Sequence, residues 1–148
     1  MDNDEIISTL NDLIETSKDG EEGFRTCADD VSDPQLKTFF SNRAQSCAAA
    51  AVELQDMVRA FGGNPETSGG LGGAIHRRWV DIKALLTGKD VKAVLRECVR
   101  GEDFAVASYR RALERNLPAH VRAVVERQYQ GVLQNHDQVR SLADQYRA

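Results

Sequence analysis

The sequence predicts an all-α protein in which four long helices form a bundle, with an extended connection between the second helix and the third. Three observations predict this fold. Hydrophobic residues recur at alternating steps of three and four through four long stretches. A glycine-rich segment separates the second stretch from the third. The 148 residues, 41% of them hydrophobic, suffice for one core, so a single domain is expected over residues 1–148.

The first two helices are predicted over residues 3–31 and 34–61, where the hydrophobic spacing is continuous. Asp33 and Pro34 mark the start of the second helix. An Asp side chain accepts hydrogen bonds from the free N–H groups of a first turn, and Pro suits the first helical position. A chain reversal before Pro34 therefore makes the two helices antiparallel.

The second connection begins with residues 62–73, which contain six of the eleven glycines. A flexible connection is expected here rather than a phosphate-binding loop, because no Lys-Ser or Lys-Thr pair follows and no strand precedes. A short helix is predicted over residues 74–86, and long helices over 89–116 and 118–147. This connection is long enough to run back along the bundle, which would make the second and third long helices parallel. One long crossover between two antiparallel pairs is the ferritin-like topology.

Charge and composition limit the partners and the compartment. The formal charge is −4 and there is no Lys/Arg-rich tail, so a nucleic acid is not an expected partner. No apolar run is long enough to span a membrane, and the N-terminus lacks the positive charge of a secretory signal, so a cytoplasmic location is expected. Cys27, Cys47 and Cys98 form no C-x-x-C motif and are expected as reduced thiols.

Several polar residues occupy positions on or beside the predicted hydrophobic stripes. Since buried polar groups are normally paired, we expect a buried polar layer at the middle of the bundle. Its predicted members are Glu21, Arg43, Glu102, Gln128, Asn135 and His136. Glu21 and Arg43 lie equally far from the first turn, which predicts an ion pair between them.

The alternative for this layer is a metal site. Ferritin-like di-iron proteins use a Glu from each of two helices and a Glu-x-x-His motif from each of the other two. The residues that fit this pattern in part are Glu21, Glu97, Glu102 and His136. Leu133 stands where a companion Glu would be, and Arg43 would repel a divalent cation. No cofactor is therefore expected, with iron or another divalent metal kept as the alternative and a small anion on Arg43 as another.

Catalysis has no positive signature in the sequence, because no Ser/His/Asp or Cys/His arrangement is present. A third interpretation is a protein-interaction module that uses the crossover. Its candidate surface consists of Leu71, Ile75, His76 and Trp79. Gly20 and Gly23 lie in the middle of the first helix, which predicts close approach of a neighbour such as Trp79.

Four segments resemble a bacterial family of uncharacterised ferritin-like four-helix-bundle proteins. They are residues 10–24 (LNDLIETSKDGEEGF), 75–79 (IHRRW), 97–103 (ECVRGED) and 135–140 (NHDQVR). The resemblance implies a bundle with a crossover, a bacterial cytoplasmic setting and kinship with rubrerythrin-like and stress-associated bundles. We therefore expect a non-catalytic homo-oligomer with a binding or stress-related role, and a degenerate metal-binding protein is the alternative.

Overall fold

The computed structural model describes residues 1–67 and 91–146, and all regular elements within these ranges are helices. They are α1 (Asn3–Asp30), α2 (Pro34–Ala60), α4 (Val91–Leu113) and α5 (Ala119–Gln145). The all-α, four-helix prediction is confirmed, and the observed bounds lie close to the predicted ones. The short helix predicted over 74–86 lies outside the described residues. None of the four described helices carries an apolar stretch that could cross a bilayer.

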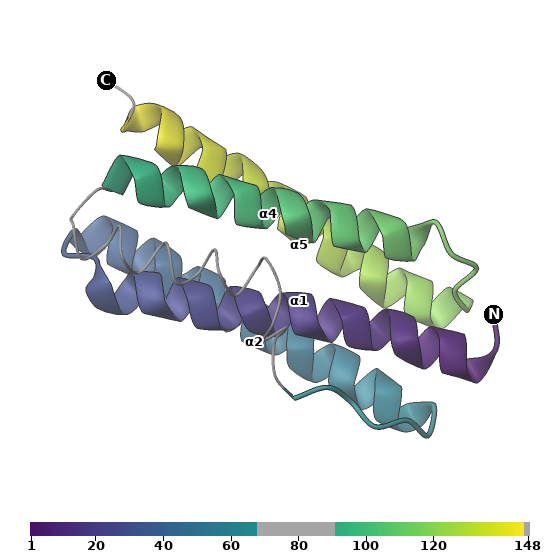
Figure 1. Ribbon diagram of the computed structural model, residues 1–148. Helices are drawn as coiled ribbons and strands as arrows, with labels where there is room; N and C mark the ends of the chain where they lie inside the picture. Colours follow the sequence, from purple (N-terminus) through teal and green to yellow (C-terminus); the bar gives the residue numbers. More distant parts are fainter. Residues whose placement is uncertain (68–90, 147–148) are drawn as a thin grey trace.

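The helices form two antiparallel pairs, α1 with α2 and α4 with α5 (Figure 1). The pairs meet mainly through α1 and α4, and more sparsely through α2 and α5. Every neighbouring pair is therefore antiparallel, whereas α2 and α4 lie diagonally across the bundle and run in the same direction, as predicted (Figure 1). The connection between α2 and α4 thus joins opposite ends of the bundle.

Asp33 begins α2 in the way the sequence predicts. Its side chain accepts hydrogen bonds from the backbone N–H groups of Gln35, at 2.8 Å, and Leu36, at 3.3 Å. It also accepts a hydrogen bond of 3.0 Å from the hydroxyl of Tyr146, just beyond α5. These hydrogen bonds lower the pKa of Asp33, and the bond from Tyr146 has the largest effect, followed by the two backbone bonds. One carboxylate thus starts a helix and ties the end of α5 to the α1–α2 turn.

The glycine-rich connection starts close to α1. Gly62 has φ 80°, a left-handed conformation that favours glycine, and it ends α2. Asn11 of α1 accepts a hydrogen bond from the backbone N–H of Glu66 at 2.9 Å, and Gln55 of α2 donates one to the Glu66 carbonyl at 2.8 Å. The first residues of this connection are therefore tethered to both helices of the first pair.

The buried hydrophobic side chains form two separate core clusters. One lies toward the α1–α2 turn and includes Phe24, Cys27, Leu36, Phe40, Leu95, Cys98 and Val139. The other lies toward the α4–α5 turn and includes Ile6, Leu10, Leu13, Leu54, Val58, Tyr109, Val121 and Val125. Between them lie buried polar side chains, so the middle of the bundle differs chemically from both ends.

Gly20 lies in this middle section and allows a close approach of α2. A Cβ atom added at Gly20 would lie 2.8 Å from the Sγ atom of Cys47 and 3.7 Å from its Cβ atom. The expectation of close approach is therefore met by Cys47. The proposed neighbour Trp79 lies outside the described residues.

We expect Gly20→Ala to lower the free energy of unfolding, because crowding against Cys47 costs about 1–3 kcal/mol and exceeds the helix-propensity gain. In a Cys47→Ala background the same substitution should stabilise the protein by about 0.5–1 kcal/mol, since only the propensity gain remains. Urea unfolding of the wild type, both single variants and the double variant measures this reversal. Equal effects of Gly20→Ala in both backgrounds would show that Cys47 does not pack closely against Gly20.

Candidate functional site

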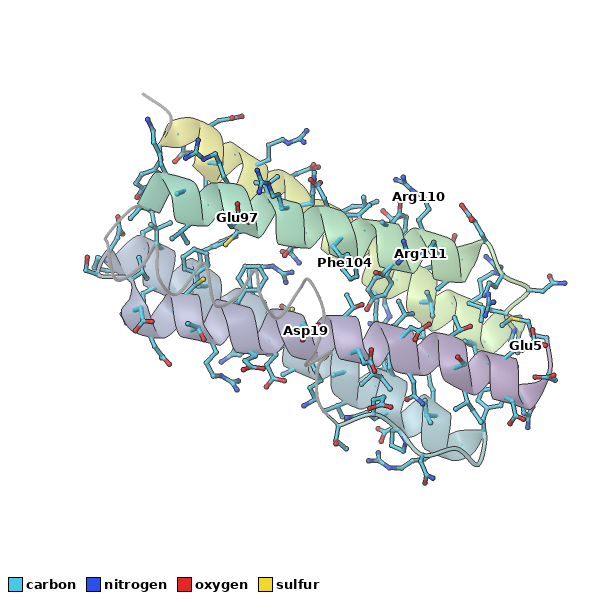
Figure 2. All side chains as sticks on the ribbon, viewed as in Figure 1. Glu5, Asp19, Glu97, Phe104, Arg110 and Arg111 are labelled. Atoms are coloured by element: carbon cyan, nitrogen blue, oxygen red, sulfur yellow. The ribbon has the colours of Figure 1, made fainter. Side chains whose placement is uncertain are left out.

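A cavity of about 900 Å³ lies between the two helix pairs, at the level of the polar middle section. All four helices line it, from Ser17 and Gly20 on α1 to Gly131 on α5. Figure 2 shows Phe104 of α4 across from Asp19 of α1, two residues that line this cavity. Small residues leave space here, and those that form part of the wall include Ala50, Gly101, Ala105 and Gly131.

The polar centre of the cavity wall is an ion pair between Arg43 of α2 and Glu102 of α4. Arg43 Nη2 lies 2.7 Å from Glu102 Oε1, and the two side chains are only 7% and 2% exposed. The guanidinium also lies over the ring of Phe24, 5.2 Å from its centroid. Burial lowers the pKa of Arg43, but Glu102 and, after it, Cys47 together raise it by more, so the net pKa is raised. The Arg43 guanidinium is therefore held in its charged form.

The Arg43–Glu102 contact uses one nitrogen and one carboxylate oxygen. Arg43 Nε and Glu102 Oε2 are buried and have no hydrogen-bond partner. A guanidinium and a carboxylate can form two parallel bonds, whereas Arg43 and Glu102 form one. Both residues line the cavity. The pair is therefore incompletely hydrogen-bonded, which adds to the cost of burying it.

A second polar element joins all four helices through Tyr109 and Gln128. The hydroxyl of Tyr109 on α4 donates to Gln128 Oε1 at 2.7 Å and lies 3.5 Å from Ser17 Oγ on α1. Gln128 of α5 donates in turn to Glu53 of α2 at 2.7 Å, and Glu53 also pairs with Arg127. Burial raises the pKa of Tyr109 to about 12, so its hydroxyl stays protonated and serves as the donor.

Cys47 is the thiol in the cavity wall. Burial raises the pKa of Cys47 to about 11, and the neighbouring Arg43 lowers it by less than burial raises it. The thiolate is the reactive form of cysteine, so Cys47 is held in its unreactive form at neutral pH.

The six residues of the predicted polar layer do not all lie in the bundle centre. Arg43, Glu102 and Gln128 are buried, and Asn135 is half-buried and lines the cavity. The predicted Glu21–Arg43 ion pair is wrong. Glu21 instead pairs with Lys18 at 3.3 Å and Arg25 at 3.1 Å along its own helix, because Arg43 turns across the bundle interior to Glu102.

His136 lies against Asp103, and its other ring nitrogen is 3.7 Å from Asp137. Glu97 contacts Arg100 at 2.9 Å. Together with the pairs of Glu21 and Glu102, these contacts distribute the four metal-ligand candidates over separate partners. Among the residues that the structure describes, no three His, Cys, Asp or Glu side chains gather in a way that could hold a metal ion.

Tyr109, Glu53 and Cys47 also belong to the site, and none of them was predicted from the sequence as a site residue. Tyr109 follows the hydrophobic spacing of its helix, and the available signal was that a buried tyrosine hydroxyl normally needs a hydrogen-bond partner. Glu53 lies beside the stripe of its helix and gives no signal of its own. The predicted interaction surface of Leu71, Ile75, His76 and Trp79 lies outside the described residues.

One protein family matches most of the chain. The family described as "Domain of unknown function (DUF2383)" matches residues 5–115. This range includes the Arg43–Glu102 pair and Tyr109 and ends before Gln128. None of the curated proteins matches the chain.

We expect Arg43→Ala to destabilise the protein by about 3–5 kcal/mol, because Glu102 would remain as an uncompensated buried charge. Arg25→Ala is the matched control, since Arg25 is 57% exposed and pairs with Glu21 on the surface. That control should cost less than about 1 kcal/mol. Chemical denaturation of the three proteins tests this difference. A loss below about 1 kcal/mol for Arg43→Ala would contradict a buried pair.

The raised pKa of Cys47 predicts slow alkylation. At pH 8, iodoacetamide should modify Cys47 on the order of a hundredfold more slowly than an exposed thiol, because far less thiolate is present. The rate should keep rising through pH 10, since a group with a raised pKa stays protonated until the pH nears its folded value. Peptide mass spectrometry follows the reaction, with Cys47→Ala/Gln45→Cys as the exposed control on the same helix. A plateau for Cys47 near pH 8.5 would contradict the prediction.

Proposed function

Because the chain belongs to the family described as a domain of unknown function, DUF2383, we propose its function from the geometry: it is a non-catalytic protein that binds a small molecule between its two helix pairs. The observation that carries this proposal is the central cavity with its buried ion pair. This pocket of about 900 Å³ is partly open to solvent and reaches inward to the ion pair, and concave sites of this kind are where small molecules bind.

The size and position of the cavity support this proposal. Small-molecule sites have volumes of roughly 300–1,000 Å³, and in bundles they lie between the helices. Such sites combine mainly apolar walls with a few placed polar groups. Here Phe104, Ala105 and Val132 supply apolar surface, and Arg43 and Glu102 supply the polar groups.

The state of the cavity side chains supports a binding role rather than a catalytic one. Cys47 and Tyr109 are both held in their neutral, protonated forms, which are the weaker nucleophiles and bases. Arg43 and Glu102 neutralise each other. Because Arg43 and Glu102 are already paired with each other, we assign them a role in positioning a ligand and not in proton transfer.

We further propose that the scaffold is a ferritin-like bundle in which the Arg43–Glu102 pair stands in place of a di-iron centre. Three features support this assignment: neighbouring helices are antiparallel, α2 and α4 run in the same direction, and the polar residues lie between two hydrophobic clusters. A charged guanidinium supplies the positive charge that a metal would otherwise bring to buried carboxylates.

Variants at Gly131 of α5 test the binding site. A Cβ added there meets nothing within 4 Å, and the residue lines the cavity. Gly131→Phe should therefore occupy cavity space, whereas Gly131→Ala leaves most of it open. Both variants should fold at least as stably as the wild type, because replacing a mid-helix glycine by Ala gains about 0.5–1 kcal/mol and Phe gains part of that.

Nile red, a neutral apolar dye, is a suitable probe for this cavity. Its fluorescence should rise on binding to the wild type and to Gly131→Ala, and the affinity should fall by about tenfold or more in Gly131→Phe, because displaced apolar contacts are lost. Circular dichroism melts check that both variants are folded. Absence of Nile red binding to the wild type, or equal affinity for Gly131→Phe and Gly131→Ala, would contradict a ligand site in this cavity.

A further inference from the structure

A groove of about 600 Å³ lies between α4 and α5, toward the start of α4 and the end of α5. None of the residues that the structure describes in its wall lines the central cavity. Val99 and Ala143 are half-buried in the groove and pack against the hydrophobic cluster that includes Phe24. The other described lining residues are charged, and they are Lys92, Arg96, Arg100, Arg140 and Asp144. Four cations thus line the groove with one carboxylate, in a protein whose formal charge is −4.

Three of these cations have no partner in the part of the chain that the structure describes. The exposed side chains of Lys92, Arg96 and Arg140 form no hydrogen bond or ion pair there. Every other Lys or Arg side chain that is described has such a partner, as Arg25 and Arg59 have on their own helices. The unpartnered cations are therefore gathered in this one groove.

The positions of the cations make the empty groove electrostatically unfavourable. Lys92, Arg96 and Arg100 follow one another at four-residue steps along one side of α4, and like charges at this spacing destabilise a helix. Lys92 also lies near the start of α4, whose first turn has no acidic residue and whose dipole disfavours a cation there. Glu97 pairs with Arg100 at 2.9 Å and offsets part of the repulsion. A bound anion would offset more of it.

We infer that this groove binds the phosphate chain of a small molecule, such as a triphosphate. A guanidinium donates two parallel hydrogen bonds to a phosphate, and an ammonium group adds a point charge. Lys92 and Arg100 are separated by about 12 Å along the helix axis, so a chain of phosphates reaches more of the cations than one phosphate does. Val99 and Ala143 offer little apolar surface, so charge selects the ligand. The inference does not depend on the function proposed for the central cavity.

Isothermal titration calorimetry on the intact chain tests the inference, at low ionic strength and without divalent metal ions. The ligands are tripolyphosphate, orthophosphate, citrate, ATP and adenosine. Tripolyphosphate should bind about tenfold or more tightly than orthophosphate, because it reaches more cations. It should also bind more tightly than citrate, in which a carbon frame separates the charges. ATP should bind and adenosine should not, since adenosine has no phosphate.

Arg96→Gln/Arg140→Gln removes two cations of the groove. The matched control is Arg25→Gln/Arg59→Gln, which changes the net charge equally at side chains that are 57% and 56% exposed outside the groove. The affinity for tripolyphosphate should fall by about tenfold or more in the groove variant and stay within about twofold in the control. Circular dichroism melts check folding, and Lys92→Gln/Arg140→Gln is a second groove variant with the same expected loss.

The outcomes decide between a built site and general attraction of charge. Similar losses in the groove variants and the control would overturn the inference, and so would absence of tripolyphosphate binding to the wild type. Orthophosphate or citrate binding as tightly as tripolyphosphate would overturn the phosphate chain as the ligand, as would adenosine binding as tightly as ATP. Equal affinities for ATP and tripolyphosphate would support a free phosphate chain, and tighter binding of ATP would support a nucleotide as its source.

Discussion

The ion pair between Arg43 and Glu102 is the constraint on which the middle of this bundle depends. It joins α2 to α4, two helices that lie diagonally and are not neighbours. A buried charge without a partner is expensive, so each side chain requires the other at one height and one rotation of its helix. Since the two helix pairs otherwise meet sparsely, we interpret the pair as the device that sets their register.

The cavity lies beside the ion pair that connects the diagonal helices α2 and α4. An Arg and a Glu side chain reach across the bundle centre, while smaller residues such as Gly20, Ala50 and Gly131 form other parts of the wall at the same level. Two hydrophobic clusters close the bundle above and below it. The chain of Ser17, Tyr109, Gln128 and Glu53 ties the four helices together at one edge. Hydrophobic packing is thus concentrated at the two ends, and the polar pocket lies between them.

The helices were predictable from the sequence because their signals are local. Hydrophobic spacing located all four, and the Asp33-Pro34 start of α2 was predicted with its cap. The relative direction of α2 and α4 followed from the length of the connection. The positions of Arg43 and Glu102 at the bundle centre were also visible as polar residues on hydrophobic stripes.

The pairing within the site was not predictable in the same way. Equal distance from a turn places Glu21 and Arg43 at the same height, but it does not say toward which helix each side chain turns. Glu21 found partners on its own helix, and Arg43 turned inward to Glu102. The cavity itself depends on the spacing of the two helix pairs, a property of tertiary packing that no local pattern contains.

A double-mutant cycle between Arg43→Met and Glu102→Leu measures the central interaction most directly. Each single variant leaves one buried charge alone and should lose about 3–5 kcal/mol, whereas the double variant should lie within about 1 kcal/mol of the wild type or exceed it. The coupling free energy would then be larger than about 3 kcal/mol. Additive losses in the double variant would contradict the account, because they would show that Arg43 and Glu102 do not depend on each other.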